Sequence, residues 1–187
     1  MTQETYLLGS GPPSREIERL DVQHAFWAKL TGRTLLPKPI SSYLATVPSP
    51  RVGDLGTGNA NWLVDLGTQL PPTSTLAGFD ISADIFPPVD KRPENLTLEI
   101  HNAIEPFPEE YLGTFDVVHA RLLTYGVKKG EWEIIARNIF ALLKPGGWIM
   151  FEETGYPSWV TIPPSKAANA ILEVDIAFAK KVGRDLM

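Results

Sequence analysis

The hydrophobic pattern at the start of the chain has a helical period. Apolar or aromatic side chains recur every three or four residues: Ile17, Leu20, His24 and Trp27. This spacing predicts a helix over residues 14–30, which the hydroxyl group of Ser14 can cap. Residues 32–50 hold four prolines and no such period, so we expect an irregular connector there. We therefore treat residues 1–50 as a helical extension that covers a site on the domain formed by residues 51–187.

From residue 51 onward the period changes, and short apolar runs alternate with amphipathic stretches. The apolar runs predict strands over residues 51–55, 75–79, 96–101, 115–120 and 147–153. The amphipathic stretches predict helices over residues 59–70, 131–143 and 165–183. Alternation of this kind indicates an α/β fold with right-handed crossovers and a doubly wound, mostly parallel sheet. Such sheets bind ligands at the carboxyl ends of their strands, so we expect the functional residues there.

Composition narrows the classes of partner. The 187 residues are 43% hydrophobic and 21% charged, which is typical of one globular domain. The net charge is −5 and no basic run stands out, so we expect no nucleic-acid partner. No apolar run approaches the ~20 residues of a membrane-spanning helix, and the first residues lack the apolar core of a signal peptide. We expect a cytoplasmic protein with no membrane partner.

The content of cysteine and histidine limits the chemistry further. The chain contains no cysteine, which excludes disulfides, thiolate zinc sites and cysteine nucleophiles. Its three histidines, His24, His101 and His119, do not have the spacing of metal ligands. We therefore expect no metal site.

A Gly-x-Gly turn follows the first predicted strand. Gly56-Thr57-Gly58 can bring bare backbone against a ligand and aim the N–H groups of the next helix at it. Asp54 precedes the turn and would repel a phosphate, which favours a ligand that is cationic or rich in hydroxyl groups. S-adenosylmethionine is both. The turn alone is weak evidence, because many proteins contain one without binding any ligand.

Two further polar residues end neighbouring predicted strands. Asp80 follows the second strand and can accept hydrogen bonds from ribose hydroxyls, or it can serve a turn or helix cap. Asn102 follows the third strand and can accept from an adenine amino group, or it can be an ordinary turn residue.

These features together resemble the class I S-adenosylmethionine-dependent methyltransferases, which have a Rossmann-like sheet of strand order 3-2-1-4-5. The resemblance covers about residues 50–153 and rests on four motifs: Asp54-Leu55-Gly56-Thr57-Gly58, Asp80, Phe115-Asp116-Val117-Val118-His119-Ala120-Arg121 and Leu143-Lys144-Pro145-Gly146-Gly147. The N-terminal sequence is similar to the entry helix of fungal secondary-metabolite methyltransferases, a group with regulator-like members. The matching segments are Tyr6-Leu7-Leu8, Glu16-Ile17-Glu18-Arg19-Leu20 and Gln23-His24.

The resemblance implies a binding site for S-adenosylmethionine or S-adenosylhomocysteine. The implied cofactor-binding residues are Asp54, Gly56, Thr57, Gly58, Asp80, Ile81, Asn102, Ala103 and His119. Gly56 and Gly58 would approach the methionine part, Asp80 would hold the ribose, and His119 would face the methionine end and the substrate. The family usually has Asp at the position of Asn102, so we expect the affinity to be altered rather than abolished.

Methyl transfer needs the nucleophile and the methyl group held in line, and it needs a base only where the nucleophile keeps its proton. His119 and His24 are the candidate catalytic bases, with a structural hydrogen bond and a packed helix face as the respective alternatives. Glu152 and Glu153 end the fifth strand and either position a substrate or lie in solvent. For Arg121 we expect a salt bridge.

Class I methyltransferases usually continue with two more strands, which are absent here. The fifth strand would then be an exposed edge, and we expect a homodimer or heterodimer that pairs with it or covers it. The predicted function is methylation of an oxygen or nitrogen atom of a small molecule in secondary metabolism. Two alternatives stay open: a cofactor-binding protein that catalyses a dehydration or pericyclic step, and a non-enzymatic partner subunit.

Overall fold

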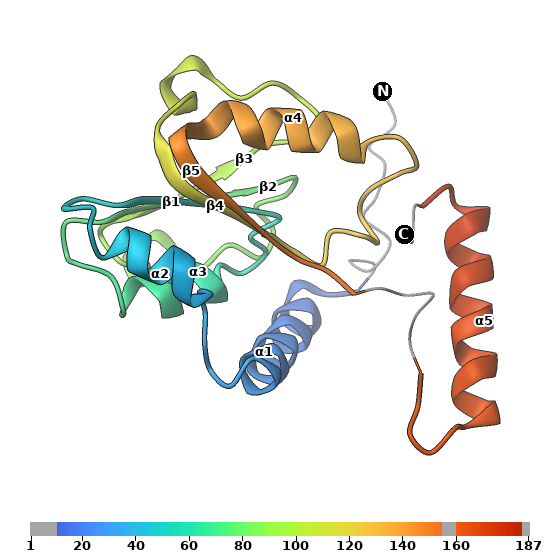
Figure 1. Ribbon diagram of the computed structural model, residues 1–187. Helices are drawn as coiled ribbons and strands as arrows, with labels where there is room; N and C mark the ends of the chain where they lie inside the picture. Colours follow the sequence, from blue (N-terminus) through green and yellow to red (C-terminus); the bar gives the residue numbers. More distant parts are fainter. Residues whose placement is uncertain (1–10, 155–159, 185–187) are drawn as a thin grey trace.

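A five-stranded parallel sheet forms the centre of the protein. The computed structural model describes residues 11–154 and 160–184. The strand order is β3-β2-β1-β4-β5, and every neighbouring pair is parallel, which confirms the predicted doubly wound sheet. The strands are β1 (Arg51–Leu55), β2 (Thr75–Asp80), β3 (Leu96–Ile100), β4 (Phe115–Arg121) and β5 (Leu143–Glu152). Figure 1 shows helices on both faces of this sheet.

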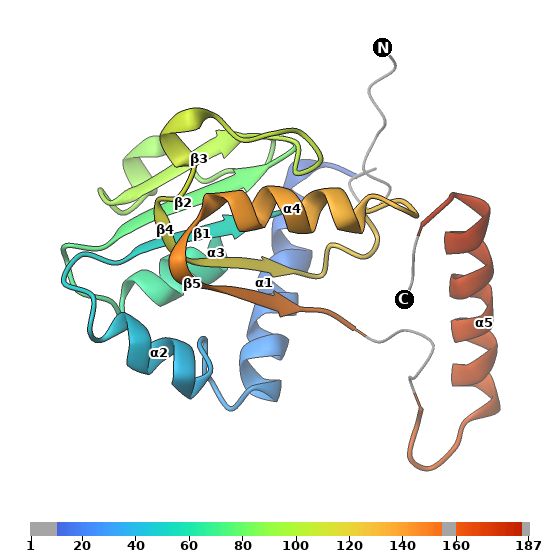
Figure 2. The same cartoon turned by 45° about the horizontal axis from the view of Figure 1, so that its top comes forward.

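The helices divide between the two faces and the edge of the sheet. They are α1 (Pro13–Leu30), α2 (Lys38–Leu44), α3 (Asn61–Gly67), α4 (Trp132–Leu142) and α5 (Lys166–Lys181), with 3-10 helices η2 (Val89–Lys91) and η3 (Glu109–Tyr111). In Figure 2, α2 and α3 lie on the face of the sheet opposite to α4. None of the helices in the described part of the chain is long and apolar enough to span a bilayer.

Successive side chains of the central strands point to opposite faces of the sheet and form a separate hydrophobic core on each face. Val117 and Val118 are consecutive in β4 and both fully buried, yet they belong to different clusters. Val117 packs in the cluster that contains Leu63 of α3, whereas Val118 packs in the cluster that contains Ile139 of α4. Successive side chains of a strand point to opposite faces, so a parallel sheet covered on both faces needs apolar residues at every position.

The connector predicted over residues 32–50 is not irregular throughout, because it contains α2. The prolines misled the prediction. Pro37 is the N-cap residue and Pro39 is the second helical residue, where the missing backbone N–H would have had no partner within the helix. Ile40 and Leu44 are then buried against the sheet.

The boundaries of the other helices also differ from the prediction. Ser14 does not cap α1, which begins at Pro13 after the N-cap residue Pro12. The helix predicted over residues 59–70 is shorter: α3 begins at Asn61, after the left-handed Ala60 with φ of 62°, and ends at Gly67. At the other end of the chain, α5 ends at Lys181, and Gly183 follows the C-cap residue Val182 with φ of 73°.

The Lys144-Pro145-Gly146-Gly147 motif lies within β5 rather than before it. The residues that pair across β4 and β5 shift there: Phe115 pairs with Leu143, then Val117 with Trp148. This shift is a bulge in which extra residues of β5 face Asp116. A Cβ atom on Gly147 would lie 3.1 Å from three backbone carbonyl oxygens, so the bulge favours glycine there.

The β5 edge has no neighbouring strand in the described sheet. Trp148 and Phe151 of β5 are 39% and 41% exposed. α5 lies beyond this edge, apart from the other helices (Figures 1 and 2), and Asp175 accepts a hydrogen bond of 2.9 Å from the hydroxyl group of Tyr125. A second chain that covers β5 stays a prediction. The segment Tyr6-Leu7-Leu8 lies outside the described residues.

Two neighbouring residues of α4 test the packing of the sheet. Ile139→Ala removes a fully buried side chain, so the free energy of unfolding should fall by about 2–5 kcal/mol. Phe140→Ala alters a side chain that is 74% exposed and should change the free energy of unfolding by less than about 0.5 kcal/mol. Urea denaturation of both variants measures the difference. Equal losses would contradict the assigned orientation of α4.

Candidate functional site

The glycine turn connects β1 to α3 at the carboxyl end of the sheet. Its residues Gly56, Gly58 and Ala60 all have a left-handed backbone, with φ of 65°, 57° and 62°. The N–H group of Thr57 donates to the carbonyl oxygen of Phe79 at 3.1 Å, which ties the turn to β2. The turn therefore lies over the β1–β2 end of the sheet, as the sequence predicted.

Both positions favour glycine because their positive φ would strain any other residue, and apolar side chains also approach the turn closely. A Cβ atom on Gly56 would overlap the side chain of Leu123, which follows β4. A Cβ atom on Gly58 would lie 3.0 Å from Cδ1 of Leu20 on α1. The two leucines thus form apolar walls beside the turn, and the backbone at Gly56 remains exposed.

Asp80 joins the turn to the end of β2. One carboxylate oxygen accepts from the N–H group of Gly58 at 2.8 Å, and the other accepts from the N–H group of Ser82 at 3.3 Å. Burial raises the pKa of Asp80, although these backbone donors oppose the rise. A carboxylate has about four acceptor positions, so Asp80 retains acceptor capacity beyond its backbone donors, which include the N–H group of Ile81.

The residues predicted to flank an adenine lie at the ends of β2 and β3. The side-chain oxygen of Asn102 accepts from the N–H group of Ile104 at 3.3 Å, an ordinary turn contact. The carbonyl oxygen of Ala103 accepts from the side chain of Asn138 at 2.8 Å. Ile81 is 57% exposed beside them.

His119 is the buried centre of the site. Its Nδ1 lies 2.7 Å from Oδ1 of Asp54, and its Nε2 lies 3.0 Å from Oε2 of Glu152. The ring stacks on Trp62 with centroids 3.8 Å apart and is 1% exposed. Burial opposes the charge, but the two carboxylates outweigh burial and raise the pKa of His119. In this arrangement neither ring nitrogen is free to take a proton from a substrate.

A chain of charged contacts continues from His119 to the N-terminal helix. Arg121 lies 3.8 Å from Glu152 and donates from Nη2 to Nδ1 of His24 at 3.1 Å. The other nitrogen of His24 lies 2.8 Å from Asp65 of α3. His24 is therefore a buried helix-face residue with both nitrogens engaged, which matches the structural alternative.

Glu153 follows β5 and holds the loop after β4. Its carboxylate accepts from the N–H group of Leu123 at 2.6 Å and from the hydroxyl group of Thr124 at 2.5 Å. Burial raises the pKa of Glu153 against these donors. Glu152 and Glu153 thus both have partners, and the reading of either as a solvated strand end was wrong.

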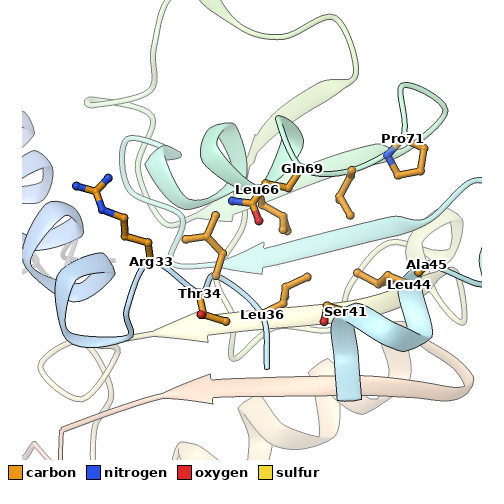
Figure 3. Close-up of a pocket in the computed structure, with 11 residues that line it drawn as sticks. Arg33, Thr34, Leu36, Ser41, Leu44, Ala45, Leu66, Gln69 and Pro71 are labelled. Atoms are coloured by element: carbon orange, nitrogen blue, oxygen red, sulfur yellow. The ribbon is translucent and has the colours of Figure 1, made fainter. Parts of the chain in front are cut away.

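One hollow of the structure lies away from the glycine turn. A cavity of about 660 Å³ opens between α2 and the end of α3 (Figure 3). Leu44 and Leu66 line its floor, and Arg33 and Gln69 lie at its margin. None of the predicted site residues lines it, so it is separate from the site at the glycine turn. Within residues 11–154 and 160–184, no group of three or more histidine, cysteine or acidic side chains could hold a metal ion.

The donor set at the turn fits S-adenosylmethionine. Bare backbone at Gly56 can approach a ligand, Asp80 offers acceptors to a ribose, and the hydroxyl group of Thr57 is buried without a partner. No basic side chain lies in the turn itself, which suits a ligand without phosphate.

Comparison with known proteins decides the family. A model of the methyltransferase domain matches residues 23–180, which is most of the chain. The chain belongs to this methyltransferase domain family. Among the relatives of this chain is the N-methyltransferase tcpN of Claviceps purpurea, 37% identical over 166 residues, covering 88% of this chain and 57% of tcpN. Another is the N-methyltransferase gliN of Aspergillus fumigatus, 35% identical over 141 residues, covering 74% of this chain and 47% of gliN.

A solved structure of an S-adenosylmethionine-dependent methyltransferase from Mesorhizobium loti also matches. It is 23% identical, covers 66% of this chain and 52% of that chain, and gives a TM-score of 0.49. The chain spans about half the length of the fungal relatives that it matches.

The pH dependence of stability tests the charge on His119. Its pKa in the folded protein is raised above 6.5, so its contribution is complete below pH 6.5 and is lost as the pH rises through the higher folded value. His119→Gln should lower the free energy of unfolding by about 3 kcal/mol near pH 6, and by less near pH 9.

Urea denaturation between pH 6 and 9 measures this gap, with His101→Gln as the control. A gap between wild type and His119→Gln that stays constant over the range would contradict a charged His119.

Proposed function

We propose that the protein is an S-adenosylmethionine-dependent methyltransferase that acts on a nitrogen atom of a small molecule in secondary metabolism. The observation that carries the proposal is the left-handed glycine turn with Asp80 bonded across it, in a chain of the methyltransferase domain family. Nitrogen is favoured over oxygen because the relatives tcpN and gliN are named N-methyltransferases.

The cofactor would supply a methyl group already activated on a sulfonium. Gly56, Thr57 and Gly58 would hold its methionine part, and Asp80 would bind the ribose hydroxyls. Asn102 and Ala103, with Ile81, would flank the base.

His119 would act on the site by position rather than as a base, since both ring nitrogens bind carboxylates. Glu152, His119 and Asp54 form a bonded group at the carboxyl ends of β5, β4 and β1. The remaining task of the protein is to hold the nucleophile and the methyl group in line and to exclude water.

Calorimetric titration with S-adenosylhomocysteine tests the cofactor site. We expect saturable binding by the wild type and about tenfold to hundredfold weaker binding by Asp80→Ala, because hydrogen bonds to a charged group contribute ~1.5–3 kcal/mol. Asp84→Ala is the matched control, since Asp84 is exposed and four residues away. Equal affinity of wild type and Asp80→Ala would refute the assigned ribose contact.

Transfer of a labelled methyl group tests the reaction. S-adenosylmethionine with a labelled methyl group is incubated with the protein and a panel of small amines and amides, and we expect label in an N–H compound. Conversion of a compound without label would favour the dehydration or pericyclic alternative. Cofactor binding without any conversion would favour a partner subunit.

A further inference from the structure

The glycine turn has an unusual backbone that its own side chains do not secure. Three alternate residues, Gly56, Gly58 and Ala60, are left-handed, and only the first two are glycines. Ala60 is also the N-cap residue of α3, and no side chain caps that helix. A left-handed residue other than glycine persists only where its surroundings hold it in place.

Hydrogen bonds from backbone N–H groups hold three residues of the turn. Thr57 bonds to Phe79, Gly58 bonds to Asp80, and Ala60 donates to the carbonyl oxygen of Thr57 at 2.9 Å. The two asparagines on either side of Ala60 are held from outside. Nδ2 of Asn59 and Nδ2 of Asn61 both donate to Oδ1 of Asp21, each at 2.7 Å.

Asp21 is presented by a helix that is itself fixed on both sides of it. Leu20 lies against Gly58, and His24, one turn further along α1, bonds to Asp65 and Arg121. The helix therefore has one face that contacts the turn, α3 and the end of β4. Val22 and Phe26 of α1 are 66% and 58% exposed and do not belong to that face.

We propose that Asp21 is a positioning residue of the cofactor site, which clamps Asn59 and Asn61 around Ala60 and so holds the glycine turn in its binding shape. The inference rests on the proposed cofactor site. Through Asp21, helix α1 affects the affinity for the cofactor, although the carboxylate of Asp21 acts on the turn and does not touch the cofactor.

Calorimetric titration with S-adenosylhomocysteine is the first test. Asp21→Ala should weaken binding about tenfold, the effect of losing charge-assisted hydrogen bonds. Asp21→Glu keeps the carboxylate and should restore part of the affinity. Glu18→Ala removes another exposed carboxylate of the same helix and should bind as the wild type does. Asp21 is exposed, so these variants should fold.

A double-mutant cycle separates the clamp from a general role of α1. In the Asn59→Ala/Asn61→Ala background, Asp21→Ala should have no further effect on affinity. An equal loss of affinity in both backgrounds would overturn the clamp, as would wild-type affinity in Asp21→Ala.

Amide hydrogen exchange gives a readout that does not need the cofactor. Exchange at Gly58 and Ala60 should be faster in Asp21→Ala than in Glu18→Ala. If the folded wild type binds no S-adenosylhomocysteine, the proposed function fails, and exchange alone decides the clamp. Unchanged exchange at both amides would then overturn it.

Discussion

His119 lies between two carboxylates at the carboxyl end of the sheet, of which Asp54 is buried and Glu152 is partly buried. Asp54 of β1 and Glu152 of β5 lie on either side of His119 in β4, and Asp54 pairs in register with His119. Taking carboxylates out of water is unfavourable unless they are paired and hydrogen-bonded. The imidazole ring of His119 contacts both carboxylates, one through each nitrogen. The ring also stacks on Trp62 of α3, the helix that follows the glycine turn.

The contacts of His119 contribute both to the fold and to the candidate site. The contacts of His119 fix three strand ends and one helix, and Arg121 extends them to His24 of α1. Asp54 and Trp62, which both contact His119, flank the glycine turn in the sequence, and Leu20 of α1 lies against Gly58. A precise ligand site needs first-contact groups that are supported by a second layer of packed and bonded residues.

Local pattern predicted the parallel sheet and most of its elements, because apolar periodicity and turn chemistry are properties of short segments. The strand order was implied by the resemblance to class I methyltransferases. Local pattern missed α2, because prolines outside helices and prolines in a first helical turn look alike in sequence. It also placed the Lys144–Gly147 motif before β5, since a bulge depends on pairing with β4 rather than on the local residues.

The site was predicted less completely than the fold. The turn and Asp80 could be found from their spacing, but the partners of His119 could not. Glu152 lies 33 residues away, and its contact with the ring exists only through strand pairing. Asp21 had no local signal at all, since its partners are 38 and 40 residues along the chain.

The charge state of His119 tests the account most directly. Nitrogen-15 NMR of the imidazole rings distinguishes an imidazolium from either neutral tautomer, and His→Gln variants assign the three histidines of the chain. At neutral pH both ring nitrogens of His119 should carry protons, each donated to a carboxylate. A neutral ring with one bare nitrogen at that pH would contradict the bridge between Asp54 and Glu152 and would restore His119 as a candidate base.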